Sequence, residues 1–148
     1  MKILILTIVM SLLMDAPVHM NWDTLADVSF TSEYVEEYDA NFFVPVFGPQ
    51  VKALEGKEVV LKGYMLPIAP EENLFILSKN TYASCFFCGV GGPETIVEIQ
   101  FQPGHPQFKM DQVVKVKGIL SLNKDDVEHC NYILRGAEVF KGKMSEDL

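Results

Sequence analysis

The pattern of apolar and polar residues indicates β-strands over most of the chain after residue 56. Between 57 and 66, Val59 and Leu61 fall on one side of an extended chain, whereas Lys62 and Tyr64 fall on the other. Successive side chains of a strand point to opposite faces, so this period of two is typical of a half-buried strand. Alternating or short apolar runs recur along the chain, and together they predict strands over 57–66, 74–77, 97–101, 114–120 and 132–140.

Two of these strands carry a glycine at the same place. Val59-Val60-Leu61-Lys62-Gly63 and Val114-Lys115-Val116-Lys117-Gly118 are nearly the same run. A glycine inside a strand marks a bulge or a bend, which a small barrel needs where its longest strands coil. We therefore predict a mainly β fold, a closed five-stranded antiparallel barrel of the OB type, with a small sandwich as the alternative. The side chains expected inside are those of Val59, Leu61, Val97, Ile99, Val114 and Val116.

The stretch 21–56 is irregular and rich in aromatic residues. Residues 28–30 alternate and 34–36 do so weakly, which is enough for a short strand. Pro49 is well placed to begin one short helix that runs to Leu54 and stops at Gly56. We expect this segment to pack on the barrel, which spans 57–141, and residues 142–148 to form a flexible tail.

Residues 1–20 resemble a signal peptide. Lys2 follows Met1, and the run from Ile3 to Met14 is almost wholly apolar. Its length suits the apolar region of a secretory signal and is short for a membrane span. The mature protein is therefore expected in the periplasm or outside the cell, without a stable membrane span after cleavage. An uncleaved anchor or a buried N-terminal strand is the alternative.

The charge of the chain limits its partners. Lys and Arg number 12 against 20 Asp and Glu, a formal net charge of −8. An acidic surface repels phosphate backbones, so we expect no nucleic acid partner. The sequence has no nucleophile motif, no H-E-x-x-H run and no phosphate loop, which favours a protein that is not an enzyme.

Candidate chemistry is concentrated in the loop between the second and third predicted strands. Cys85 and Cys88 form a C-x-x-C pair followed by Gly89, a spacing that lets both sulfurs face one metal ion. Zinc takes about four ligands, so this pair is half of a structural site. The candidates for the remaining ligands are His129, Cys130, His105 and Glu94.

His129 and Cys130 are adjacent, and on an extended chain they face opposite sides, so only one would normally join the pair. We favour His129, which lies beside a polar turn, with Cys130 as the alternative ligand. His105 stands between prolines and is most simply a loop residue.

Other interpretations of the loop stay open. A C-x-x-C pair can be a thiol/disulfide redox pair, although Gly-Gly-Pro after Cys88 is a poor start for the helix that would activate it. The cysteines can equally form a local disulfide or be small buried residues. Phe86 and Phe87 are either core residues or a surface that contacts a partner.

Several motifs resemble a family of small exported bacterial proteins of unknown function, over roughly residues 21–141. They are Trp22–Leu25, Gly56–Pro67, Cys85–Gly89, Gly92–Glu94 and His129–Leu134. Relatives place a C-x-H at the cysteine loop, so the resemblance implies a Cys/His metal-binding habit. Here Cys88 stands one position after the place of that His.

Two functions of different classes follow. One is an exported OB-like module, not an enzyme, that binds zinc or a similar divalent ion through Cys85, Cys88 and His129 or Cys130. The other is a metal-free module that contacts an unknown protein in the cell envelope through its aromatic N-terminal segment, Phe86 and Phe87. A thiol/disulfide redox protein is a further alternative.

Overall fold

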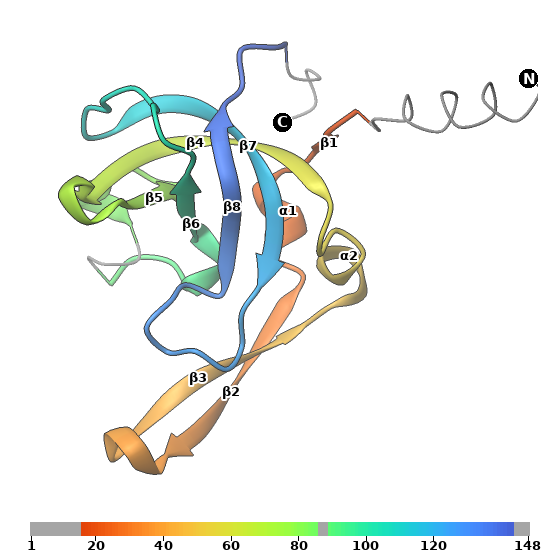
Figure 1. The fold of residues 1–148 in the computed structure, drawn as a ribbon. Coiled ribbons are helices and arrows are strands. Elements are labelled where there is room, and N and C mark those ends of the chain that lie inside the picture. The colour runs from red at the N-terminus through yellow and green to blue at the C-terminus, as the bar shows by residue number, and fades with distance from the viewer. Residues whose placement is uncertain (1–15, 86–88, 144–148) are drawn as a thin grey trace, which may run out of the picture.

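The computed structural model describes residues 16–85 and 89–143, and its centre is a closed five-stranded barrel (Figure 1). All five predicted strands are confirmed, each within a few residues of its expected bounds. They are β4 (Glu58–Ala69), β5 (Leu74–Ser78), β6 (Ile96–Phe101), β7 (Gln112–Leu122) and β8 (Tyr132–Val139). The loop that carries the cysteines joins β5 to β6, as expected.

The strands follow the order β4-β5-β6-β8-β7, and β7 pairs back with β4 to close the ring. Four neighbouring pairs are antiparallel, but β6 and β8 are parallel. The prediction of a wholly antiparallel barrel was therefore wrong in this one pair. The reason is geometric, because strand directions cannot alternate all the way around a closed ring with an odd number of strands.

The predicted core lies inside the barrel. Val59, Val97, Ile99 and Val116 are 0% exposed, and Leu61 and Val114 are also buried. Lys115 and Lys117 alternate with these valines and reach the surface, where the Lys117 ammonium lies 2.7 Å from Glu138. The period of two thus predicted both the strands and the face that each buries.

The two strand glycines have different roles. We expected a bulge or a bend at Gly63, and the register of β4 on β7 runs through it without a shift, which excludes a bulge in this pair. A Cβ at Gly63 would lie 2.7 Å from the Ser78 carbonyl oxygen and 2.9 Å from Trp22 Cζ2, so the glycine permits a close approach. At Gly118 the pairing of β7 with β8 does shift, as predicted.

The N-terminal segment is more regular than expected. It contains α1 (Trp22–Leu25), α2 (Pro49–Lys52) and a hairpin of β2 (Val28–Val35) and β3 (Ala40–Phe47), preceded by the short strand β1 (Val18–His19) on β4. The single expected helix is thus joined by a second. The hairpin escaped prediction because 31–34 are all exposed, which leaves no period of two.

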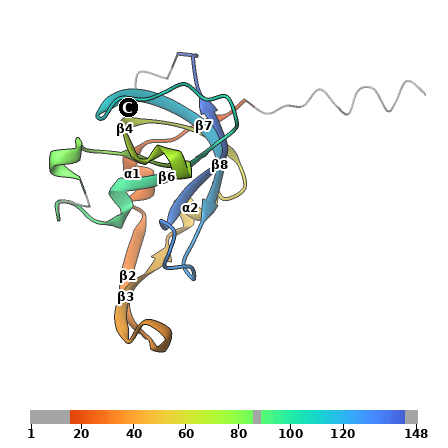
Figure 2. The same ribbon diagram turned by 60° about the vertical axis from the view of Figure 1, so that its left-hand side comes forward.

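The segment is anchored to the barrel at its base. Leu25 and Val51 are 0% exposed and belong to the same core as Val59. The buried Tyr132 hydroxyl donates a hydrogen bond of 2.7 Å to the Leu25 carbonyl oxygen. Beyond this base the hairpin extends away from the barrel in both views (Figures 1 and 2).

The predicted signal segment and tail fall mostly on residues 1–15 and 144–148, which lie outside the described part of the chain. Within 16–85 and 89–143, the helices are too short and too polar to cross a membrane.

Candidate functional site

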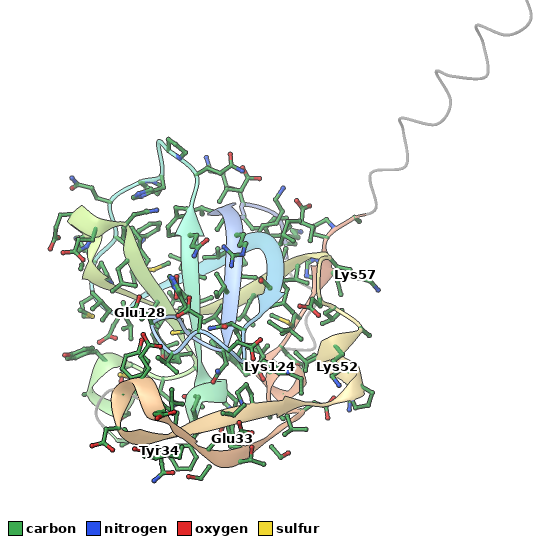
Figure 3. All side chains as sticks on the ribbon, turned by 60° about the horizontal axis from the view of Figure 1, so that its bottom comes forward. Glu33, Tyr34, Lys52, Lys57, Lys124 and Glu128 are labelled. Carbon is green, nitrogen blue, oxygen red and sulfur yellow. The ribbon has the colours of Figure 1, made fainter. Side chains whose placement is uncertain are left out.

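The hairpin and the barrel enclose a cleft of about 580 Å³, here called the hairpin cleft. Its walls are the hairpin β2–β3, the outer face of β5 and β6, and the loop 123–131 between β7 and β8 (Figure 3). In OB barrels the second and third strands and the loop between the fourth and fifth bind ligands. By strand order those elements correspond here to β5, β6 and the loop 123–131, all of which contribute residues to the hairpin cleft.

Apolar side chains line much of this cleft. Leu74, Ile76 and Ile96 come from β5 and β6. Phe43 of the hairpin is 72% exposed and Ile68 of β4 is 40% exposed, although both are large and apolar. Exposed apolar side chains gathered around one hollow are typical of a binding surface.

The loop 123–131 is held in one shape by Asn123. Its side-chain amide donates hydrogen bonds to the carbonyl oxygens of Asp126 (2.7 Å), His129 (3.3 Å) and Cys130 (3.2 Å). Its amide oxygen accepts one from the Asp126 N–H at 3.0 Å. This wall of the cleft is therefore organised before any ligand arrives.

Glu98 ties the same loop to the barrel. The residue is only 5% exposed, and its carboxylate lies 2.9 and 3.0 Å from Nδ1 of His129. It also accepts hydrogen bonds from the Cys130 N–H at 3.2 Å and from Nε2 of Gln100 at 3.0 Å. A buried carboxylate needs such partners, and here they come from the loop and from β6 itself.

The contact with Glu98 fixes the orientation of the His129 ring. Because Nδ1 contacts the Glu98 carboxylate, Nε2 stays available for other contacts. The carboxylate nearest to Nε2 is that of Asp126, at 4.0 Å. The side chain is 44% exposed. An imidazole held in this way can exchange a proton or coordinate a ligand through its second nitrogen.

Cys130 and Cys85 lie in one small apolar cluster with Leu66, Ile76 and Ile96. Cys85 is 0% exposed, and neither sulfur is in a disulfide. The pKa of the Cys130 thiol is raised to about 12, first by burial and second by the charge of Glu98. Cys130 is therefore a protonated thiol at neutral pH, the opposite of an activated nucleophile.

The structure thus brings part of the predicted metal site together. Cys85, Cys130 and His129 lie around the outer face of β5 and β6, whereas Cys88, Phe86 and Phe87 lie outside the described residues. Over 16–85 and 89–143, no three His, Cys, Asp or Glu side chains are close enough together to hold a metal ion.

The other predicted ligands lie elsewhere. The His105 ring packs against both Phe75 and Phe101, with centroids 5.0 Å from each, and it stacks on Phe108. Glu94 lies in the 3₁₀ turn Pro93–Thr95. His105 is thus part of an aromatic cluster at the end of the barrel.

Sequence reasoning missed Glu98 and Asn123. The alternation in 97–101 placed Glu98 on the outer face, which suggested an ordinary surface residue. The sequence carried no signal that set it apart, because Gln100 on the same face of the strand is polar too. The loop that buries Glu98 is more than twenty residues away in sequence, so only the structure reveals the contact between Glu98 and this loop.

Comparison with known proteins supports the fold alone. No protein-family model matches the chain, and no curated protein is similar to it in sequence. Among solved structures, a DUF3299 family protein from Pseudomonas aeruginosa PAO1 is similar with a TM-score of 0.51 and 19% identity, over 87% of this chain and 99% of that one. The similarity fits the small β-barrel.

Proposed function

We propose that this protein is an exported binding module, not an enzyme, and that its hairpin cleft takes up an extended segment of a partner protein in the cell envelope. The observation that carries the proposal is the cleft itself, lined in part by elements that correspond to the ligand-binding ones of an OB barrel. Export and membership of a family of small exported bacterial proteins are parts of the same proposal, supported by the charged and apolar start of the chain and by its motifs.

A polypeptide fits the walls of the cleft better than a small molecule does. β2 and β3 pair only with each other among the described strands, so each has one edge free to pair with an extended chain. Phe43 of the cleft wall is exposed, and aromatic side chains dominate the binding energy of many protein interfaces.

A selection of extended peptides would test this function. Peptides enriched on the wild-type protein should bind Phe43→Ala at least tenfold more weakly, because the aromatic side chain supplies much of the apolar contact. Val46→Ala is the matched control, since Val46 is 52% exposed on the same strand but does not line the cleft. Peptides that bind both variants as well as the wild type would contradict the proposal.

Zinc binding is a second candidate, favoured by the position of Cys85 and Cys130 in one cluster. Cys88 would have to supply a further thiolate, with His129 or Cys130 completing the set. Binding of the ion would displace thiol protons, so its affinity would fall in acid. Metal analysis of the natively purified protein tests this candidate: bound zinc that is lost in Cys85→Ser supports it, and three free thiols without zinc contradict it.

A further inference from the structure

We infer that the segment recognised by the hairpin cleft is basic, with Lys or Arg side chains alternating with apolar ones. This inference rests on the proposed function and adds the chemical class of the partner. Its basis is the combination of an apolar floor with an acidic mouth.

The carboxylates of the cleft are unevenly distributed. Glu98 is buried and already contacts His129. The exposed carboxylates at the mouth of the cleft are those of Glu33, Asp125, Asp126 and Glu128. Figure 3 shows Glu33 on the hairpin and Glu128 on the loop across from it. Lys124 is the one lysine among the lining residues, and the chain has no arginine there.

Apart from Asp126, which lies 4.0 Å from Nε2 of His129, these acidic side chains have no basic partner among the described residues. In the described parts of the chain, Glu33, Asp125 and Glu128 have no lysine or arginine within salt-bridge distance. Carboxylates on both walls of a narrow cleft raise the local concentration of cations and repel anions. A basic segment would supply the positive partners that these carboxylates lack.

The apolar floor sets the second requirement. Leu74, Ile76 and Ile96 lie deep in the cleft, whereas the carboxylates are at its edge. An extended chain presents alternate side chains to opposite sides, so apolar residues can reach the floor while basic ones reach the rim. A simple cation would leave the apolar surface uncovered.

Other occupants fit less well. A second copy of this chain would bring another net charge of −8 to an acidic cleft. Nucleic acids and anionic lipid surfaces are repelled for the same reason. The charge therefore favours a basic polypeptide over each of these classes.

Three synthetic nine-residue peptides test the inference: alternating Val-Lys, Val-Ser and Val-Glu. Titration calorimetry at low salt should show the Val-Lys peptide binding at least tenfold more tightly than Val-Ser, with no binding of Val-Glu. The affinity of Val-Lys should fall as salt is raised, because salt screens exposed charges. Phe43→Ala should weaken Val-Lys as well, which separates uptake in the cleft from attraction to the acidic surface in general.

The charge of the rim is tested by the double variant Asp125→Asn/Glu128→Gln. An exposed ion pair contributes up to about fivefold in affinity, so we expect a loss of about tenfold for the two. Asp23→Asn/Glu55→Gln removes the same charge from exposed positions outside the cleft and should leave the affinity unchanged.

The outcomes separate this inference from the proposed function. If Val-Ser and Val-Lys bind with equal affinity, or if both double variants lose the same affinity for Val-Lys, the inference that the segment is basic is wrong. The cleft would then remain a peptide site without that preference. Failure of all three peptides to bind would overturn the inference too. A selection that yields no Phe43-dependent peptide of any charge would overturn the proposed function itself.

Discussion

Glu98 shows how one buried charge can organise an exposed loop. Its carboxylate contacts the ring of His129 and the backbone N–H of Cys130, and both contacts join β6 to the loop 123–131. Hydrogen bonds to a charged group stabilise a fold more than neutral ones, and leaving the donors unpaired is costly. The shape of one cleft wall therefore depends on a residue that no ligand needs to touch.

Replacing Glu98 with alanine should loosen the loop. We expect the free energy of unfolding to fall by about 2–3 kcal/mol, since donors from His129 and Cys130 lose their acceptor. Urea unfolding measures this change, and hydrogen exchange should localise it to 123–131. Glu98→Gln keeps one acceptor oxygen and should cost less. An equal loss in both variants, or unchanged exchange in the loop, would contradict this role.

Gly63→Ala should destabilise the barrel by about 1–3 kcal/mol, the usual range for overpacking. The added Cβ would lie 2.7 Å from the backbone oxygen of Ser78, which cannot move without disturbing β5. Thermal unfolding measures the effect. Gly56→Ala tests backbone strain in place of crowding, because Gly56 has open space around it but a φ of 76°. Wild-type stability in Gly63→Ala would show that the close approach is not required.

Cys130 should make the protein less stable in alkali. The unfolded thiol ionises near pH 9, whereas in the fold its pKa is raised to about 12. Between these values the unfolded chain releases a proton that the folded chain keeps, so the free energy of unfolding falls as the pH rises. Urea unfolding at pH 7.5 and 10 should show a larger loss for the wild type than for Cys130→Ala. Equal losses would mean that the thiol ionises freely.

At the scale of elements, Tyr132 connects the last strand to the first helix. Its hydroxyl reaches the Leu25 carbonyl oxygen, and its ring packs edge-on against Phe47 at 5.6 Å. The base of the hairpin is thus attached to β8 as well as to its neighbours in sequence, where the Gln50 N–H donates to the Asp27 carboxylate. This attachment sets the direction in which the hairpin leaves the barrel.

Tyr132→Phe should therefore cost about 1–2 kcal/mol in unfolding free energy, because a buried carbonyl loses its donor while the ring is kept. Chemical denaturation measures the loss. The variant should also weaken Phe43-dependent peptide binding, since the hairpin is less firmly held. Unchanged stability would show that the Leu25 carbonyl finds another donor.

The barrel and the hairpin differ in how far the sequence predicts them. In β7 one face is buried and the other largely solvated, so Val116 and Lys117 reveal both strand and orientation, and in β4 the pair Leu61 and Lys62 does the same although Val60 and Leu66 are buried on the outer face. The hairpin is solvated on both faces near its tip, so residues 31–34 carry no such contrast. The pairing of β2 with β3 is local, through residues 36–39, but without an alternating pattern near the tip its register could not be predicted.

The same limit applies to the site. The cysteine loop could be located from spacing alone, and His129 and Cys130 were identified as candidates. Their common partner Glu98 could not be identified from the sequence. It is the parallel pairing of β6 with β8 that brings the start of β8 beside Glu98, and this pairing is seen only in the structure. Cys88 lies outside the described residues, so the complete ligand set of a zinc site stays a prediction.

At the scale of the whole molecule, the compartment is testable on its own. We expect the protein outside the cytoplasm and shortened by about twenty residues, within the usual range of about 15–30 for a signal peptide. N-terminal sequencing of protein from the periplasm or the medium checks both points. Recovery of an intact Met1 from the cytosolic fraction would contradict export.

The parallel pair β6–β8 has a consequence for the time course of folding. β8 is the last strand in the chain, yet it lies between β6 and β7, so the ring cannot close until residues 132–139 are available. The tie from Tyr132 to Leu25 likewise spans 107 positions. Contacts this distant in sequence are slow to form. A nascent chain would thus hold an open, incomplete ring until residues 132–139 had been made.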